Sequence, residues 1–290
     1  MGTVFNQPDY AAAYQLIEWR RFKEALAEAE RQLRLEPEDP DGMALVAEIY
    51  YQMNEYEKAL HWSREAMLRE PDHQLAWYVR VRVHFETNEM KAFNESVEEA
   101  LRIDPYEPHY YFLKAQLLNK KSKFREAKEE LLLALELRPE SPLYLASMSY
   151  TEALLGNDEE SQRLDRQAIR EGAEQPIVLM YLAWAAAERG DYSLREDYMR
   201  SAVRLSPDDK QYQDEYLEAL QQNNTVFKVL LYPGRLLRKL RPWQVFLVWA
   251  LAWLLFKPLL VLFIIIYVLV HWGSKAIVHL KVFGWRGRGR

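Results

Sequence analysis

Apolar and polar residues are distributed in two different ways along the 290 residues of the chain. Up to about residue 222 they alternate in short blocks, and key positions recur every 34 residues. Between Trp243 and Trp272 the sequence is almost continuously apolar, with Lys257 as its one charged residue. The first pattern is typical of a repeat protein, and the second predicts a segment that enters a membrane.

Prolines mark the repeat most clearly, because five of them fall on the 34-residue spacing and only Ala173 interrupts the series. These prolines are Pro37, Pro71, Pro105, Pro139 and Pro207. Alanine stands five positions before four of them, with Gln32 as the exception, and an alanine also occurs earlier in three repeats, as Ala25, Ala59 and Ala127. An aromatic residue stands three positions before each of these three alanines. Small residues at fixed points let two helices approach closely, the aromatic fills the space beside them, and proline ends the second helix.

This pattern resembles that of the tetratricopeptide repeat family, most clearly in "YYQMNEYEKALHWSREAMLREPD" (residues 50–72) and "AQLLNKKSKFREAKEELLLALELRPE" (residues 115–140). The resemblance implies an all-α solenoid of about six helix–turn–helix repeats within residues 6–209. The expected repeats are 6–39, 40–73, 74–107, 108–141, 142–175 and 176–209. Residues 210–222 are expected to form a capping helix that closes the solenoid.

Two repeats depart from the pattern. The third has Phe93 where a small residue is expected and Met90 in place of the aromatic, and the fifth has Asp158 and Ser161 and lacks the terminal proline. We therefore expect these two repeats to be looser or differently tilted.

In the tetratricopeptide family the first helix of each repeat lines a concave face, so the resemblance implies a groove. Its predicted lining residues, eight of them aromatic, are Tyr10, Tyr14, Glu48, Tyr51, Tyr78, Arg82, Phe85, Phe112, Gln116, Asn119, Tyr150 and Trp184. Aromatic residues are enriched at interaction hot spots, which favours a groove for a protein or peptide partner. Arg82, Gln116 and Asn119 would hold the backbone or a carboxylate of that partner. The alternative is that several of the aromatics only pack between neighbouring helices.

One subclass of the family clamps the terminal carboxylate of chaperones with Lys and Asn at paired groove positions. Here those positions hold Tyr10, Tyr14, Ala44 and Glu48, so we do not expect this activity. No phosphate loop, dinucleotide-binding glycine motif or nucleophile elbow occurs in the sequence, and its six histidines are not spaced as metal ligands. We therefore predict no enzyme activity, no cofactor and no metal.

Charge divides the chain at about residue 220. Eleven of the 38 Lys and Arg residues lie beyond it and none of the 43 acidic residues do, so residues 1–220 carry a net formal charge of −16. Such an acidic body would repel nucleic acid. The basic flanks are expected to contact anionic lipid headgroups instead.

The apolar run of 30 residues is too long for one helix across a bilayer, because it would measure about 45 Å against a hydrocarbon core of about 30 Å. We predict a membrane segment over residues 243–280, folded as a hairpin that turns at Lys257 and Pro258, with a single span or a re-entrant segment as alternatives. A hairpin puts the basic residues of both flanks on one side, as the positive-inside rule favours. Interfacial anchors would be Trp243, Trp249, Trp253 and Trp272. Residues 223–242 are predicted to be a basic amphipathic linker, and residues 281–290 a basic tail.

These observations predict a membrane-anchored scaffold that docks a partner in the groove, with its repeat domain in the cytoplasm. The alternative is a structural subunit of a membrane complex, in which the apolar tail packs on other spans and Lys257 pairs with an acidic group there.

Overall fold

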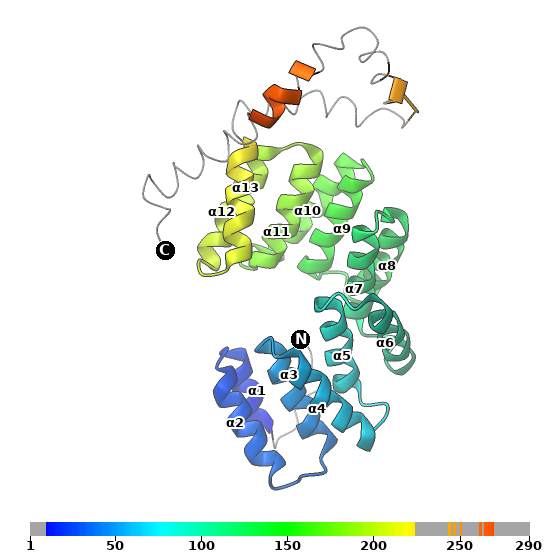
Figure 1. The fold of residues 1–290 in the computed structure, drawn as a ribbon, viewed down its shortest axis with the longest axis vertical. Coiled ribbons are helices and arrows are strands. Elements are labelled where there is room, and N and C mark those ends of the chain that lie inside the picture. Colours follow the sequence, from blue (N-terminus) through cyan, green and yellow to red (C-terminus); the bar gives the residue numbers. More distant parts are fainter. Residues whose placement is uncertain are drawn as a thin grey trace. The chain divides into compact units, whose positions relative to one another are not determined.

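In the computed structural model, residues 10–223 are described throughout, together with residues 243–244, 246–247, 250, 261–262 and 264–269. Within residues 10–223 the chain forms thirteen α-helices and no strand (Figure 1). The all-α fold predicted from the repeat is therefore confirmed. The helices belong to two compact units, which divide after Leu117 inside the seventh helix.

The first unit contains three helix pairs and most of α7. Its helices are α1 (Ala11–Glu18), α2 (Phe22–Leu33), α3 (Pro40–Gln52), α4 (Tyr56–Arg69), α5 (Gln74–Glu86), α6 (Met90–Ile103) and α7 (Pro108–Lys120). Its core is a continuous cluster of buried side chains from the first and second pairs and from α5.

The second unit contains the remaining helices. They are α8 (Phe124–Leu137), α9 (Pro142–Leu154), α10 (Asp158–Gly172), α11 (Pro176–Arg189), α12 (Tyr192–Leu205) and α13 (Lys210–Asn223). A smaller core cluster joins α11, α12 and α13 through buried residues such as Met199 and Ala219. Helix α13 occupies the place of the predicted capping helix.

Prolines fix where the helices begin. Pro40, Pro142 and Pro176 each stand in the first turn of a helix, where the missing N–H group would have no partner in any case. Before α3, Asp39 is the N-cap, and its carboxylate accepts hydrogen bonds from the N–H groups of Asp41 and Gly42. The carboxylate also accepts a hydrogen bond from the hydroxyl of Tyr10, which lies so close to Gly42 that a Cβ atom there would collide with it.

The turn inside each pair follows the same 34-residue spacing. One residue in each turn has a positive φ angle between 58° and 81°, namely Arg20, Asn54, Asn88, Ser122, Gly156 and Gly190. This left-handed conformation costs little for glycine and more for a residue with a Cβ atom. All six pairs in residues 10–223 therefore share one turn, although only two of them have glycine there.

The two helices of a pair meet along a seam of small residues. These residues are at most 1% exposed, and they include Ala13, Ala25, Ala47, Ala59, Ala115, Ala127, Ser149 and Ala183. Of the unusual residues of the third and fifth repeats, Phe93 and Ser161 lie in the seams and are completely buried, whereas Met90 is half-buried and Asp158 is exposed. Phe93 packs against Phe85, with ring centroids 5.7 Å apart. The packing at these two positions is therefore close rather than loose.

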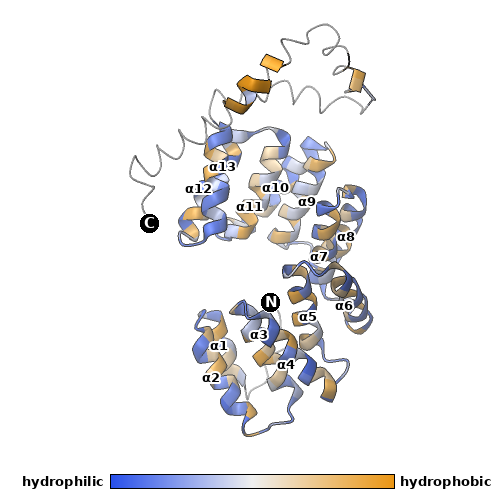
Figure 2. Cartoon of the chain, viewed as in Figure 1, coloured by the Kyte–Doolittle hydropathy of each residue, from blue (hydrophilic) through white to orange (hydrophobic). Residues whose placement is uncertain are grey.

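Most of the predicted membrane segment, including Trp249, Trp253, Lys257, Pro258 and Trp272, lies outside the described residues, as do residues 224–242 and 281–290. In the described part of the chain, none of the helices has both the length and the apolar character that a bilayer crossing requires. The described residues between 243 and 269 are helical, and Figure 2 shows the pieces at residues 261–269 in orange, whereas α1–α13 mix both colours.

Candidate functional site

The predicted groove residues of the first unit are organised around a buried ion pair. Arg82 on α5 donates hydrogen bonds to both carboxylate oxygens of Glu48 on α3, at 3.0 and 2.8 Å. The guanidinium also lies over two aromatic rings, 3.7 Å from the ring centroid of Tyr51 and 4.9 Å from that of Tyr78. Glu48 and Arg82 are 7% and 8% exposed. They occupy the same position in consecutive repeats, so the pair joins two repeats of this unit.

The electrostatics of this cluster favour the charged pair. Burial opposes the charge on Arg82, but the carboxylate of Glu48 and the neighbouring rings outweigh it and raise the pKa of the guanidinium. Burial raises the pKa of Tyr78 and, against the opposing effect of Arg82, that of Tyr51. Both phenols are therefore neutral at physiological pH. Arg82, which was predicted to hold a partner's carboxylate, is already bound to Glu48.

The other predicted residues of the first unit differ in exposure. Tyr10, Phe112 and Gln116 are buried, at 4%, 5% and 8% exposure, whereas Tyr14, Tyr51, Tyr78 and Phe85 are half-buried. Aromatic contacts link several of them to their neighbours, and the Tyr78 ring centroid lies 6.0 Å from that of Tyr110. The half-buried aromatic side chains are the ones that a partner can still reach.

The second unit holds the last three predicted residues. Tyr150 on α9 and Trp184 on α11 lie with their ring centroids 5.7 Å apart, and the ring of Tyr181 meets Trp184 edge-on at 5.1 Å. The side-chain amide of Asn119 donates a hydrogen bond to the hydroxyl of Thr151 at 2.9 Å. Its carbonyl oxygen is buried and has no hydrogen-bond partner among the described residues. An acceptor of this kind can bind a backbone N–H group.

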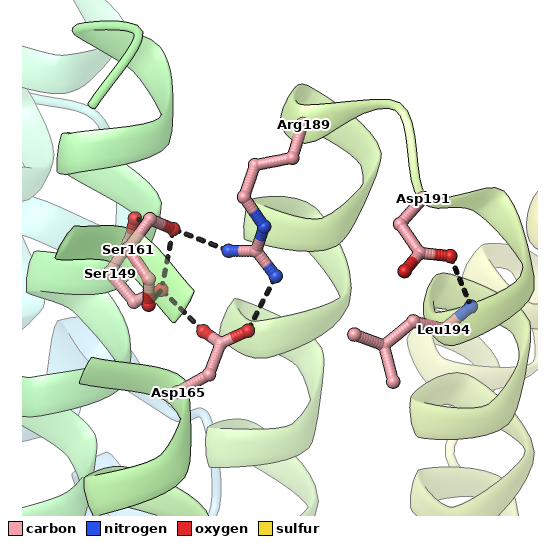
Figure 3. A network of polar contacts seen from close by, with 6 residues as sticks. All are labelled: Ser149, Ser161, Asp165, Arg189, Asp191 and Leu194. Atoms are coloured by element: carbon pink, nitrogen blue, oxygen red, sulfur yellow. Dashed lines mark hydrogen bonds and ion pairs between the residues drawn. The ribbon is translucent and has the colours of Figure 1, made fainter. Parts of the chain in front are cut away.

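A second buried polar cluster, which the sequence analysis did not single out, lies between α9, α10 and α11 (Figure 3). The hydroxyl of Ser149 donates to the carboxylate of Asp165, and the hydroxyl of Ser161 donates to the backbone carbonyl of Ser149 at 2.8 Å. Arg189, at the end of α11, reaches back and donates to Asp165 at 2.5 Å and to the hydroxyl of Ser161. The side chains of Arg189 and Asp165 are only 3% and 7% exposed.

Burial dominates the electrostatics of this cluster. It raises the pKa of Asp165, and the hydrogen bond from Ser149 and the charge of Arg189 offset only part of that effect. Burial, together with the charge of Asp165, also raises the pKa of Tyr198 on α12 to about 12. The cluster therefore holds α9, α10 and α11 together at a cost in desolvation.

The sequence contains a signal for this cluster. Ser149, Ser161 and Asp165 stand where most other repeats have apolar residues, so their polarity is a local departure from the repeat. Polar residues at buried positions require partners. A search for a fourth polar residue at the end of the next helix would have found Arg189.

Helix α13 is tied to the last repeat by Arg195 on α12. Its side chain, 5% exposed, forms ion pairs with Glu215 at 3.0 Å and with Glu218 at 3.5 Å. Arg195 occupies the seam position at which earlier repeats have Ala25, Ala59 or Ala127. In the last repeat a long cation therefore replaces the small seam residue and reaches the capping helix.

Among the residues that the structure describes, no group of three or more His, Asp or Glu side chains could hold a metal ion.

The helix pairs define an all-α repeat protein in which each repeat is two helices joined by a short turn. Tetratricopeptide repeat models match residues 108–141 and 155–210, and a model described as anaphase-promoting complex, cyclosome, subunit 3 matches residues 18–92. These matches support the tetratricopeptide repeat family that the sequence pattern resembles. Among curated proteins, none matches this sequence significantly.

Solved structures show the same fold. The chain is similar to a chain of the Cut9–Hcn1 hetero-tetramer of the anaphase-promoting complex, with 14% identity and a TM-score of 0.62, over 73% of this chain and 42% of that one. It is also similar to PilF of Pseudomonas aeruginosa, with 16% identity and a TM-score of 0.56, over 73% and 96% of the two chains. A tetratricopeptide repeat protein from Parabacteroides merdae gives 12% identity and a TM-score of 0.59, over 72% and 82%. At these identities the likeness shows the fold alone.

Proposed function

We propose that this protein is a tetratricopeptide repeat scaffold that docks a protein or peptide segment on its half-buried aromatic residues. The observation that carries the proposal is the pair of adjacent rings of Tyr150 and Trp184 in the second unit, together with Asn119, which is bonded to Thr151 next to Tyr150 in the sequence. This arrangement combines two adjacent aromatic rings with a buried acceptor that has no partner within the described chain. Aromatic anchors beside a backbone-binding amide are suited to an extended segment with apolar side chains.

The first unit supports the same function with a different surface. Its half-buried residues Tyr51 and Tyr78 place their rings against Arg82, whose charge Glu48 neutralises. An acidic partner would have to displace Glu48, which costs the buried hydrogen bonds of the pair. We therefore expect this surface to bind apolar and aromatic side chains rather than carboxylates.

We further propose that residues 243–280 anchor the scaffold to a membrane, with the repeats in the cytoplasm. The described residues 264–269 are helical and all large and apolar, and each of them is between 39% and 66% exposed. A continuous apolar surface of this kind in water indicates an interaction site or a lipid environment. The basic residues on both sides of the run favour contact with anionic headgroups.

The docking proposal is tested by site-specific crosslinking. A photoreactive phenylalanine analogue at Trp184 should capture a discrete partner in cells, and a second replacement, Tyr150→Ala, should abolish the capture. The matched control carries the analogue at Tyr106, which is 77% exposed and is not one of the predicted groove residues. Equal crosslinking from Trp184 and Tyr106 would show that the aromatic surface has no special role.

The anchoring proposal is tested by protease protection of a tag after residue 290. A hairpin leaves the tag and the repeats on the same side of the membrane, whereas a single span protects one of them. Release of the full chain from membranes by alkaline carbonate would contradict insertion altogether. Loss of a defined membrane complex in Lys257→Leu would instead support the structural-subunit alternative, because a plain anchor does not need that charge.

A further inference from the structure

The last repeat contacts the capping helix at a position whose register can be followed through the earlier repeats. It joins a residue on the second helix of a repeat to the residue sixteen positions later, on the first helix of the next element, as Arg200 Nε and the hydroxyl of Tyr216 show at 3.5 Å. The same register, four repeats earlier, brings Arg64 on α4 opposite Arg80 on α5.

The other pairs at this register combine opposite charges or include at least one uncharged residue. They are Glu30 with Val46, Glu98 with Lys114, Leu132 with Met148, Arg166 with Leu182, and Arg200 with Tyr216. Of the six pairs that the register gives within residues 10–223, Arg64 with Arg80 is the one that brings two like charges together. Such a pair is repulsive unless an anion lies between its members.

Within the described part of the chain, none of the carboxylates fills this role. Among the described residues neither Arg64 nor Arg80 forms an ion pair, and the buried Nε atom of Arg80 has no hydrogen-bond partner. Glu65, the residue after Arg64, pairs with Arg69 at 3.0 Å, and Glu89 pairs with His84 at 3.0 Å.

The electrostatics agree with a local positive potential. Burial lowers the pKa of Arg80, and the charge of Arg64 lowers it further. Burial also lowers the pKa of His84, one helical turn beyond Arg80, and the positive charge of Arg80 adds to this despite the hydrogen bond to Glu89.

The Arg64–Arg80 pair is separate from the aromatic stripe, by which we mean the predicted groove residues Glu48, Tyr51, Tyr78, Arg82 and Phe85. Arg80 lies two residues from both Tyr78 and Arg82 on α5, which is about 200° around a helix of 3.6 residues per turn. Arg80 therefore points to the other side of α5, toward α4, and a ligand there would not compete with a segment bound on the stripe.

We propose that Arg64 and Arg80 form a binding site for a phosphate group, either free or carried on a phosphorylated side chain. A phosphate carries a charge of about −1.5 to −2 at neutral pH and so matches two arginines, whereas one carboxylate would leave a positive charge. The planar guanidinium binds tetrahedral oxyanions through paired N–H groups. The charge of −16 on residues 1–220 disfavours long polyanions, which points to a single phosphate group.

The test uses the full chain in a nonionic detergent and titrates inorganic phosphate at constant ionic strength. We expect saturable binding, seen by calorimetry and as an upward shift of the His84 pKa in NMR, because the anion neutralises the nearby positive charge. Arg64→Glu supplies the acid that Glu98 provides in the next repeat, and it should weaken phosphate binding by about tenfold or more. Arg64 is exposed, so this variant should fold, which its circular dichroism melt would show.

Arg166→Glu is the matched control, because it makes the same charge change at the same register opposite Leu182. It should leave phosphate binding unchanged. Absence of binding to the wild type, or equal binding by wild type and Arg64→Glu, would overturn the site. Titration of a phosphoserine peptide against its serine counterpart then separates the two sources: tighter binding of the phosphopeptide than of inorganic phosphate indicates a partner segment, and equal binding indicates free phosphate.

Discussion

The second and fifth repeats use the same three seam positions with different chemistry. In the second repeat, α3 and α4 meet through small side chains, which are Ala47, Ala59 and Ser63. In the fifth, α9 and α10 meet through polar residues, which are Ser149, Ser161 and Asp165. All six residues are at most 5% exposed.

The comparison shows that these two repeats form the same close helix pair although the polarity of their seam side chains differs. Serine is only slightly larger than alanine, so the helices can still approach closely, and each hydroxyl donates a hydrogen bond across the seam to the backbone carbonyl of the other serine. Asp165 is tolerated because Arg189 arrives from the next helix. A buried charge needs such a partner, and removing the partner is far more costly than never having the pair.

The largest effect is expected when a charge is placed in the small-residue seam. Ser63→Asp puts a carboxylate at the position equivalent to Asp165 but without an arginine, and should destabilise the first unit by about 4 kcal/mol. Urea unfolding of the full chain in detergent, with hydrogen exchange of the α3 and α4 amides, measures the loss. Ser63→Ala is the control and should cost less than about 1 kcal/mol. Equal losses in both variants would contradict the role of charge.

Removing the cation of the fifth repeat should have the next largest effect. Arg189→Leu leaves Asp165 buried without its ion-pair partner and should cost about 3 kcal/mol in the free energy of unfolding. Arg163→Leu removes an exposed arginine of α10 and should cost at most about 0.5 kcal/mol. Adding Asp165→Leu to Arg189→Leu should restore most of the lost stability. A double variant that is less stable than the single one would mean that the pair acts in another way.

The ion pair of the first unit allows a comparable measurement. Glu48→Gln keeps the shape of the side chain but removes the charge that Arg82 binds, and should lower the free energy of unfolding by about 2 kcal/mol. Thermal unfolding measures this loss, and Glu57→Gln, at an exposed position on α4, is the control. A negligible loss would indicate that the rings of Tyr51 and Tyr78 alone stabilise the guanidinium.

A smaller effect is expected from the serines themselves. Ser149→Ala with Ser161→Ala restores the residue type of the other seams but removes hydrogen bonds to Asp165 and Arg189. The two contributions oppose each other, so the net loss should be about 1 kcal/mol. Chemical denaturation is precise enough to detect it, and a gain in stability would show that the apolar seam is the better one even beside the ion pair.

The smallest effect is a pH dependence. The pKa of Asp165 is raised in the folded protein, so its contribution favours folding at low pH and is lost as pH rises from about 4 through the folded pKa. Asp165→Asn, which does not titrate, should remove this slope. The free energy of unfolding of both proteins is measured between pH 4 and 8, and that of the wild type should fall relative to that of Asp165→Asn as the pH rises. Parallel curves would contradict the raised pKa.

Much of the fold could be predicted from the sequence because the 34-residue spacing repeats its small residues and prolines almost without a break. Alanines such as Ala59 and Ala127 are completely buried, as packing between paired helices requires. The two-unit division after Leu117 left no such trace, because the spacing continues through α7.

The candidate site could be predicted only in part. The helical register predicted that Glu48 and Arg82 lie on the same face of the repeats. It did not predict that the two side chains bind each other. Their opposite charges at equivalent positions of consecutive repeats were a usable signal. How deeply each aromatic is buried depends on the neighbouring helix, so register alone could not separate buried Phe112 from half-buried Trp184.

The shared left-handed turn has a consequence for the order in which the chain folds. A repeat array can nucleate at any repeat and then grow outward. Closing a pair is easiest where the left-handed residue is glycine, and in residues 10–223 that holds for Gly156 and Gly190, whereas Arg20 and Ser122 must adopt a conformation that is unfavourable for side chains with a Cβ atom. The pairs α9–α10 and α11–α12 are therefore the expected starting points, and the amino-terminal pair is expected to join late.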